Sequence, residues 1–305
     1  MINVVEVKAP GGPEALELAK RPDPVPAQGE IVVRVRAANI NPTDLASRAG
    51  FSFGDPIKTP FVVGWDYAGI VQSVGEGVSE FKVGDRVVGM IPWYLNKGAQ
   101  GAYAEAVAVK SEWAVALPES LDFATACTLP LNTLTAKQGL ALLKLSPASE
   151  ILINGASGAV GGFAVQMAVQ AGHRVTAVAG RDDEAWVQSL GAKVVLPRST
   201  DYKGIGRFKF AFDAVPVGDP VLEALGEGGV VVTTRPTPAA DPKRKIQQSL
   251  VLISPDRTSL REIVALAAAG KLQTRIERRY PLSAAADAHR DYERGGHKGK
   301  LILEP

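Results

Sequence analysis

The chain of 305 residues is long enough for two domains of about 150 residues each. Its 34 Lys and Arg residues nearly balance its 32 Asp and Glu residues, and a net charge of +2 argues against nucleic-acid binding, which needs a concentrated basic face. One cysteine excludes an internal disulfide framework and a multi-cysteine zinc lobe. The sequence shows no signal peptide and no apolar run of about 18 residues, so we expect a cytosolic protein without a membrane partner.

The first part of the chain, up to about Pro118, is predicted to be rich in β-strands. Residues 31–36 alternate apolar and charged side chains toward their end, which is the period-two pattern of a half-buried strand. Further short runs with glycine and proline turns between them lie at 67–74, 83–88 and 103–109. Many short strands of this kind indicate a small barrel-like β domain.

After Pro118 the pattern changes to helices, at 121–143, and then to alternating strands and helices. Strands are expected at 151–154, 175–178, 194–195, 208–214 and 229–233, and helices at 160–171, 183–190 and 260–269. This alternation predicts a doubly wound parallel sheet. Residues 273–305, with a helix at 283–292 and a strand at 300–303, break the rhythm. We therefore predict one domain at 1–118, completed by 273–305, and a second at 119–272.

The strongest motif is a glycine-rich turn between the strand 151–154 and the helix after it. Ala156, Gly158 and Gly161 occupy the three glycine positions of a dinucleotide fingerprint, with one substitution. Gly158 lets the backbone approach a pyrophosphate, Gly161 lets the helix pack closely on the strand, and free N–H groups at the helix start bind the phosphates. The alternative is a purely structural turn. The predicted cofactor-binding residues are Gly155, Ala156, Ser157, Gly158, Ala159, Val160 and Gly161.

The end of the second strand, 175–178, bears on the choice of dinucleotide. NAD sites place an acidic residue there, whereas the first large side chain in this sequence is Arg181, whose guanidinium suits a 2′-phosphate. Asp182 and Asp183 follow and offer a ribose contact or a helix cap as alternatives. We predict NADP(H) as the cofactor, with a solvated surface charge as the alternative role of Arg181.

Several segments together resemble the zinc-free medium-chain dehydrogenases/reductases of the quinone oxidoreductase, or zeta-crystallin-like, group. The segments are ANINPTD at 38–44, GWDYAG at 64–69, VGDRV at 83–87, GAYAE at 101–105, the glycine turn at 155–162 and GKL at 299–301. The resemblance covers nearly the whole chain. It implies an α/β protein with a GroES-like β-barrel substrate domain, a Rossmann domain with a doubly wound parallel sheet, and an active site in the cleft between them.

The resemblance also bears on zinc. Zinc-dependent relatives carry Cys where Asn41 stands, His where Trp65 stands and another ligand near Leu131, and none of these side chains is a zinc ligand. Cys127 is predicted to be a buried thiol. We expect no metal site. Without a Lewis acid to lower the pKa of an alcohol, reduction of an electron-poor acceptor is favoured over alcohol dehydrogenation.

The resemblance implies hydride transfer from NADPH to a quinone or an α,β-unsaturated carbonyl. It places Asn41 near the nicotinamide, where its amide would stabilise charge on the acceptor oxygen or orient the ring, although a turn after a strand is the alternative. Thr135 matches a threonine that faces the carboxamide, and Thr233 and Lys300 are expected at the cofactor. Asp44 is expected to be a cap or an anchor for Arg48 rather than an acid.

Two residues depart from the family pattern. Ala46 stands where many relatives carry a tyrosine, so the proton would come from water. Glu184 stands where relatives often carry a lysine near the adenosine phosphate, so Arg181 would compensate. The side chains expected to rim the cleft and stack on a flat substrate are aromatic, with core packing as the alternative for each, and they are Phe51, Phe53, Trp93 and Tyr94.

Two other functions stay open: an enoyl-thioester reductase of the same fold, and a non-catalytic NADPH-binding protein such as a crystallin. The balanced charge offers no basic cleft for an acyl-CoA phosphate, and the glycine turn, Asn41 and Thr135 argue against loss of catalysis. The run 247–253 reads as an edge strand, which is an aggregation hazard unless it is covered. Because relatives pair this edge across a two-fold axis, we predict a homodimer.

Overall fold

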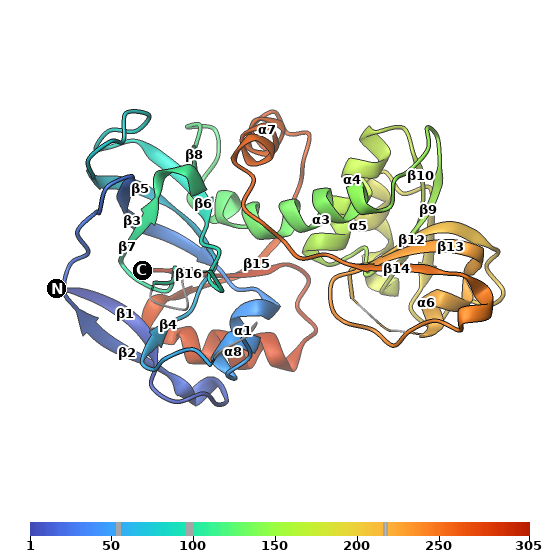
Figure 1. Ribbon diagram of the computed structural model, residues 1–305, viewed down its shortest axis with the longest axis horizontal. Helices are drawn as coiled ribbons and strands as arrows, with labels where there is room; N and C mark the ends of the chain where they lie inside the picture. The colour runs from blue at the N-terminus through green and yellow to red at the C-terminus, as the bar shows by residue number, and fades with distance from the viewer. Residues whose placement is uncertain (53–55, 96–99, 216, 218) are drawn as a thin grey trace. The chain divides into compact units, whose positions relative to one another are not determined.

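A computed structural model of the protein describes residues 1–52, 56–95, 100–215, 217 and 219–305. The chain forms two compact units, whose elements are labelled in Figure 1. The first unit comprises Met1–Leu131, Ser254–Lys271 and Arg275–Pro305, and the second comprises Asn132–Ile253 and Leu272–Thr274. Within the described ranges, no helix is both long and apolar enough to cross a membrane.

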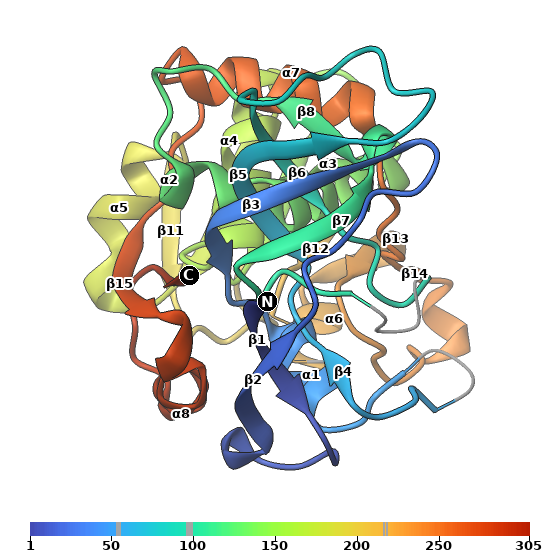
Figure 2. The same cartoon turned by 90° about the vertical axis from the view of Figure 1, so that its left-hand side faces the viewer.

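The described residues of the first unit form two β-sheets, and most of their strands are labelled in Figure 2. The larger has the order β15-β16-β3-β5-β6-β8, with β7 also paired to β3, and the smaller has the order β2-β1-β4. The strands of the larger sheet are β3 (Glu30–Asn39), β5 (Asp66–Val74), β6 (Arg86–Met90), β7 (Ala106–Lys110), β8 (Ala114–Ala116), β15 (Ile276–Pro281) and β16 (Lys300–Glu304). Those of the smaller sheet are β1 (Ile2–Val7), β2 (Leu16–Arg21) and β4 (Phe61–Val62).

The alternating sequence of β3 places its two arginines, Arg34 and Arg36, in solvent and Val35 between them in the core. At the end of β3, Asn39 lies opposite Asp66 of β5 on one side and opposite Ile302 of β16 on the other. The β3–β16 pairing makes the C-terminal segment part of the β-rich unit. It also brings the ends of three strands to one place.

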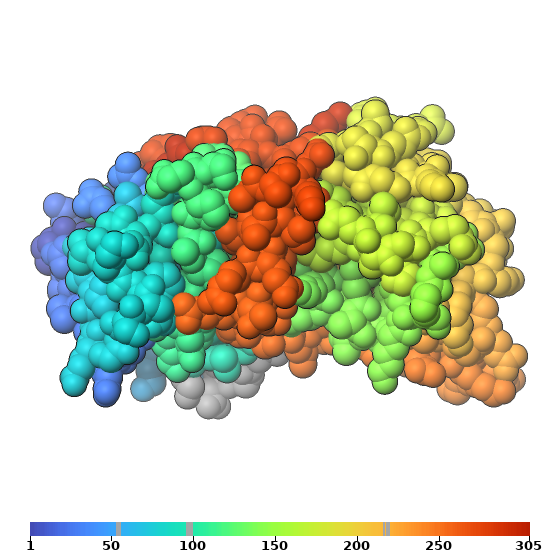
Figure 3. Space-filling model, turned by 90° about the horizontal axis from the view of Figure 1, so that it is seen from above, coloured from blue at the N-terminus to red at the C-terminus, as the bar shows by residue number. Residues whose placement is uncertain are grey.

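The helices of the first unit are α1 (Pro42–Arg48), α2 (Phe123–Cys127), α7 (Arg257–Ala268) and α8 (Ala285–Arg294). The unit extends beyond the predicted boundary at residue 118 because α2 packs on β3 and β5. It also includes α7, which the sequence assigned to the other domain. Figure 3 shows α7 in orange on the surface, where it packs against β8 and Arg257 pairs with Glu80 at 3.2 Å.

The second unit is a six-stranded parallel sheet of order β11-β10-β9-β12-β13-β14, which confirms the predicted doubly wound architecture. Its strands are β9 (Glu150–Asn154), β10 (Arg174–Ala179), β11 (Val194–Pro197), β12 (Phe208–Asp213), β13 (Leu225–Thr233) and β14 (Gln247–Leu250). Its helices are α4 (Ala159–Gln170), α5 (Glu184–Ser189), α6 (Asp219–Glu223) and most of α3 (Pro130–Leu142). Helix α4 packs on β9 and β10, α5 on β10 and β11, and α6 on β13.

The carboxyl ends of the central strands form one edge of this sheet. Asp213 of β12 lies opposite Asn154 of β9 and Thr233 of β13, and Val178 of β10 lies on the other side of Asn154. Parallel sheets bind ligands outside this edge, where the strand order reverses. In the order observed here, that reversal falls between β9 and β12.

Candidate functional site

The glycine-rich turn joins β9 to α4 at the carboxyl edge of the parallel sheet. Gly155 has a φ of +74°, a conformation that favours glycine, and the Ala156 N–H donates to the Val178 carbonyl of β10 at 3.0 Å. A Cβ on Gly161 would lie only 2.2 Å from the Gly155 carbonyl oxygen. Glycine at 161 therefore allows α4 to start directly against the turn, as the fingerprint requires.

The start of α4 fits the pyrophosphate of a dinucleotide. Gly158 is the N-cap residue, and it has no side chain that would occupy the N–H groups of the first turn. These groups have no acceptor within a helix and carry the positive end of its dipole. A phosphate placed over the N–H groups of Ala159 and Val160, the first two residues of α4, would meet both features.

Two arginines lie near the end of β10, one that follows β10 itself and one that follows the neighbouring strand β11. Arg181 is exposed at the start of a 3-10 turn that spans Arg181–Asp183. The guanidinium carbon of Arg198, which directly follows β11, lies 3.8 Å from the position that a Cβ on Gly180 would take. Sequence reasoning missed Arg198, although a basic residue after the neighbouring parallel strand was a usable signal. Asp183 Oδ2 lies 3.5 Å from the same position, so this edge of the sheet carries both basic and acidic side chains.

A buried hydrogen-bond network supports the same edge. The Asn154 side-chain amide donates to Asp213 Oδ1 at 2.7 Å and its oxygen accepts from the Tyr202 hydroxyl at 3.0 Å. Thr233, 5% exposed, donates its hydroxyl to the Arg235 carbonyl at 2.9 Å. These bonds hold the ends of β9, β12 and β13, and no local pattern in the sequence indicates them.

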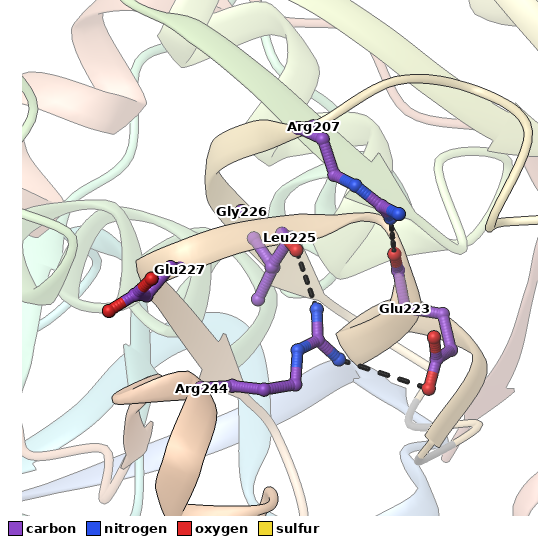
Figure 4. Close-up of a pocket in the computed structure, with 6 residues that line it drawn as sticks. All are labelled: Arg207, Glu223, Leu225, Gly226, Glu227 and Arg244. Atoms are coloured by element: carbon purple, nitrogen blue, oxygen red, sulfur yellow. Dashed lines mark hydrogen bonds and ion pairs between the residues drawn. The ribbon is translucent and has the colours of Figure 1, made fainter.

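A pocket of about 510 Å³ opens at the opposite edge, where β12 and β13 begin (Figure 4). Figure 4 shows Arg207 and Arg244 donating to the Glu223 and Leu225 carbonyls, at 2.7 and 2.6 Å. Since both guanidiniums already bind protein carbonyls and the glycine turn lies at the other edge, we do not assign this pocket to the dinucleotide.

In the first unit, the strand ends gather a second, polar site around Asn41. Lys300 Nζ donates to Asn41 Oδ1 at 3.0 Å, and Asn39 Nδ2 donates to the same oxygen at 3.0 Å. Asn41 Nδ2 donates to Asp66 Oδ2 at 2.8 Å, and the other Asp66 oxygen accepts from the Leu131 N–H at 2.9 Å. Asn39, Asn41 and Asp66 are wholly buried, and Lys300 is 6% exposed.

Burial opposes both charges in this site. It raises the pKa of Asp66 to about 6, against hydrogen bonds from Asn41, Leu131 and Asn39 that favour the carboxylate. It lowers the pKa of Lys300 to about 8, against attraction to the Asp66 carboxylate. At neutral pH the site therefore holds an ammonium and a carboxylate on opposite sides of one amide.

Asp44 caps α1, as the sequence predicts, but it does not anchor Arg48. Its Oδ2 accepts from the Asn41 backbone N–H at 2.7 Å, and burial raises its pKa to about 8. Arg48 instead donates to the Gly11 carbonyl at 3.1 Å and to Glu293 at 2.5 Å, and it contacts His289 Nδ1 at 3.1 Å. Of the two expected roles the cap is the one observed, and α8, distant in sequence, supplies two of the three partners of Arg48.

His289 of α8 lies between Arg48 and Tyr103. Its Nε2 lies 2.9 Å from the Tyr103 hydroxyl, and its Nδ1 faces Arg48. Burial and the neighbouring guanidinium lower the pKa of His289 to about 3, so the ring is neutral at physiological pH. The sequence only placed His289 in the terminal segment.

The aromatic side chains expected around a substrate occupy different environments. Trp93 is 1% exposed, donates its indole N–H to the Val62 carbonyl at 2.7 Å and packs edge-on against Phe61, which is the core-packing alternative. Tyr94 is half-buried with its ring centroid 5.3 Å from that of Trp65, and Phe51 is exposed. Phe53 lies outside the described residues.

The other predicted site residues lie in different units. Thr135 lies in the second unit on α3 and is 8% exposed. Lys300, predicted at the cofactor, has its ammonium on Asn41 in the first unit. Its contribution to the Asn41 site was missed, because nothing in the sequence pairs residues 41 and 300.

Buried polar atoms without a hydrogen-bond partner concentrate around this second site. In the described part of the chain, five of them come from residues 39–67, and they are Asn39 Oδ1, Thr43 Oγ1, Asp44 Oδ1, Trp65 Nε1 and Tyr67 Oη. Leaving such a group unpaired costs about 1–3 kcal/mol, and native proteins carry few of them. Their clustering marks this part of the unit as a candidate functional site.

Comparisons with known proteins cover both units of the chain. Residues 27–119 match the family described as alcohol dehydrogenase GroES-like domain, and residues 190–303 match that described as zinc-binding dehydrogenase. The chain is 35% identical to a chloroplast envelope quinone oxidoreductase homolog of Arabidopsis thaliana, over 97% of this chain and 95% of the relative. It is 29% identical to an NADPH-dependent alkenal/one oxidoreductase of the same plant, over 91% and 72%. The solved quinone oxidoreductase of Coxiella burnetii superposes with a TM-score of 0.88 at 26% identity, covering 100% and 99%.

One of these families is described as zinc-binding, but the residues around Asn41 do not fit zinc. The Asn41 amide is engaged with Lys300 and Asp66, and the Trp65 indole nitrogen is a donor that cannot ligate a metal. Across the residues that the structure describes, no group of three or more His, Cys, Asp or Glu side chains could hold a metal ion. We therefore derive no catalytic step through zinc.

The two units and their two sites together match one protein family. One chain contains both a parallel sheet with a dinucleotide-type glycine turn and a GroES-like domain, and relatives match it over nearly its whole length. The chain belongs to the quinone oxidoreductase family of the medium-chain dehydrogenases/reductases, and it is an oxidoreductase.

Proposed function

We propose that the protein transfers hydride from NADPH to a quinone or an α,β-unsaturated carbonyl, without zinc. The observation that carries this proposal is the buried Asn41 amide, held between Lys300 and Asp66. Hydride addition to a conjugated carbonyl leaves negative charge on its oxygen, and a fixed N–H donor stabilises that charge best when it is preorganised. The relatives named for quinone and alkenal/one reduction support this class of acceptor.

In this proposal each site residue has a specific role. The bound nicotinamide supplies the hydride. The turn from Gly155 to Gly161 binds the pyrophosphate, and Arg181 binds the 2′-phosphate with Arg198 beside it. Asn41 donates to the acceptor oxygen, and Thr135 orients the carboxamide. Because residue 46 is alanine, the proton that completes the reduction comes from water.

The proposal is tested by following NADPH oxidation against quinones, enones and enoyl thioesters. We expect turnover with quinones or enones and little with thioesters. Faster turnover of enoyl thioesters would favour the thioester reductase instead. Binding of NADPH with no turnover of any acceptor would favour a non-catalytic protein and contradict the proposal.

Changing Arg181 to alanine should raise the KM for NADPH about 10- to 150-fold, since a charge-assisted phosphate contact contributes about 1.5–3 kcal/mol. The KM for NADH should change little, because NADH lacks the 2′-phosphate. Steady-state kinetics with both coenzymes checks this. Lys193→Ala, an equal charge change on an exposed residue just before β11, is the control. An equal loss for both coenzymes would show that Arg181 does not contact the phosphate.

We also propose that the protein is a homodimer paired along β14, the edge strand of the parallel sheet. The Val251 N–H already bonds to the Thr233 carbonyl at 2.9 Å, so a change there would damage the sheet itself. Leu252 follows it, is 67% exposed and is the sharper target. Light scattering at micromolar concentration should find a dimer for the wild type and a monomer for Leu252→Lys. Leu18→Lys, at a 52% exposed leucine of β2, should stay dimeric; a monomeric wild type would refute the idea.

A further inference from the structure

Two opposite charges bind the two ends of the Asn41 side-chain amide. The ammonium of Lys300 and the amide of Asn39 donate to Oδ1, each at 3.0 Å, while Nδ2 donates to the Asp66 carboxylate at 2.8 Å. Rotating the amide by half a turn would place N–H against ammonium and oxygen against carboxylate. Both contacts would then be repulsive, so the surrounding charges allow one orientation of Asn41.

The fold holds these partners independently of Asn41. Asn39 is the last residue of β3 and pairs in register with Asp66, the first residue of β5. Lys300 is the first residue of β16, which pairs with the end of β3. Because three paired strands place the partners, they are in position before any substrate binds, and little reorganisation is needed.

We propose that Lys300 is a positioning residue that, together with Asp66, fixes the Asn41 amide and strengthens its N–H as a donor to the acceptor oxygen. A cation that donates to the amide oxygen draws electron density from the nitrogen, and linked hydrogen bonds of this kind strengthen one another. This inference rests on the proposed reduction of a quinone or enone. It gives Lys300 a task distinct from cofactor binding.

The arrangement depends on the ammonium form of Lys300. A neutral amine would also be able to accept a hydrogen bond, which would remove the repulsion at Lys300 and leave only the Asp66 carboxylate to oppose the flipped amide. Burial lowers the pKa of Lys300 to about 8, so activity should fall as the pH rises through that value. The titratable groups that act on Lys300 are Asp66 on β5, Asp44 on α1, Cys127 on α2 and His297 just before its own strand.

The test compares Lys300→Met with Lys298→Met, an exposed lysine two residues earlier, and with Asn41→Ala. For Lys300→Met we expect kcat with an enone to fall about 10- to 100-fold, somewhat less than the loss of a direct oxyanion donor. The decline in activity near pH 8 should disappear, and the Kd for NADPH should stay within about threefold of wild type, since the cofactor would lose no direct contact. Lys298→Met should resemble wild type.

The double variant Lys300→Met/Asn41→Ala identifies the route of the effect. If Lys300 acts through Asn41, the double variant should be no slower than Asn41→Ala alone, because residues that act as a unit are not additive. Losses that multiply would contradict the proposal. So would a tenfold weaker Kd for NADPH with unchanged kcat, which would assign Lys300 to the cofactor.

A measurement on the wild type keeps the inference testable if Lys300→Met does not fold, or if no quinone or enone is reduced. With asparagine labelled by ¹⁵N, the side-chain amide signals of Asn41, assigned through Asn41→Ala, should shift with a midpoint near pH 8 in the wild type and equally in Asp44→Asn, because Asp44 titrates in the same range. Signals that stay unchanged from pH 6 to 10 would overturn the positioning role. A normal titration together with an inactive panel would instead refute the proposed reaction and leave the geometry intact.

Discussion

Replacing Gly161 with alanine should weaken NADPH binding by at least about 100-fold. The new Cβ would lie 2.2 Å from the Gly155 carbonyl oxygen, a backbone atom that cannot turn aside, so α4 must move away from the glycine turn. The phosphates would then lose N–H contacts that contribute about 1.5–3 kcal/mol each, and two such losses account for the expected factor. Calorimetric titration with NADPH measures it.

The neighbouring glycine provides a matched control. A Cβ on Gly162 would meet a terminal methyl of Leu190 at 3.2 Å, and that flexible side chain can adjust. Gly162→Ala should therefore bind NADPH within a few-fold of wild type. Equal losses in both variants would point to a general defect in α4, and full affinity in Gly161→Ala would remove the turn from the cofactor site.

The second large effect concerns Asp44 and the pH dependence of stability. Burial raises its pKa from 3.8 to about 8, so between these values the folded protein holds a proton that the unfolded chain releases. Proton binding by Asp44 therefore contributes its full stabilisation of the fold below pH 3.8. This contribution to the unfolding free energy is lost as the pH rises from 3.8 toward 8. The amide introduced by Asp44→Asn does not titrate, so that variant should lack this loss.

Relative to Asp44→Asn, the wild type should lose about 3 kcal/mol of unfolding free energy between about pH 5.5 and 8, at about 1.4 kcal/mol per pH unit. Urea unfolding at several pH values measures the difference. Comparing the two proteins cancels the buried groups that do not interact with Asp44. Asp85→Asn is the control. The pKa of Asp85 is lowered from its usual value, so its carboxyl group does not titrate in this range. A constant difference across the range would show that Asp44 is ionised throughout.

Local features of the sequence predicted much of the second unit. The run Ile151–Ile153 is wholly apolar and wholly buried, and the glycine turn follows it directly, so strand, turn and helix could all be inferred from adjacent residues. β15 shows the opposite case. Its sequence, IERRYP, lacks an apolar alternation, and it forms a strand because β16 lies beside it. Pairing with a distant segment is invisible in a local pattern.

The same distinction separates the parts of the site that sequence could predict from those it could not. Asn41 and Asp44 stand in one short motif, and the cap between them was foreseeable. Lys300, one of the partners that fix the Asn41 amide, is 259 residues away, and two of the partners of Arg48 lie on α8. Trp93 is next to Tyr94 in the chain but packs into the core. Its ring packs against Phe61 and its indole N–H donates to the Val62 carbonyl, and both of these residues belong to β4.

The pairing of β3 with β16 also sets an order of events during synthesis on the ribosome. Residues 132–253 of the second unit emerge as nearly one continuous stretch and can fold while translation continues. The first unit lacks β15, β16 and α8 until residues 275–305 have left the exit tunnel. Until then the Lys300 ammonium is missing from the Asn41 site, and the end of β3 at Ala38 and Asn39 is unpaired on the side that β16 later occupies. The incomplete first unit is therefore the part of the nascent chain whose unpaired strand edge most needs protection by chaperones.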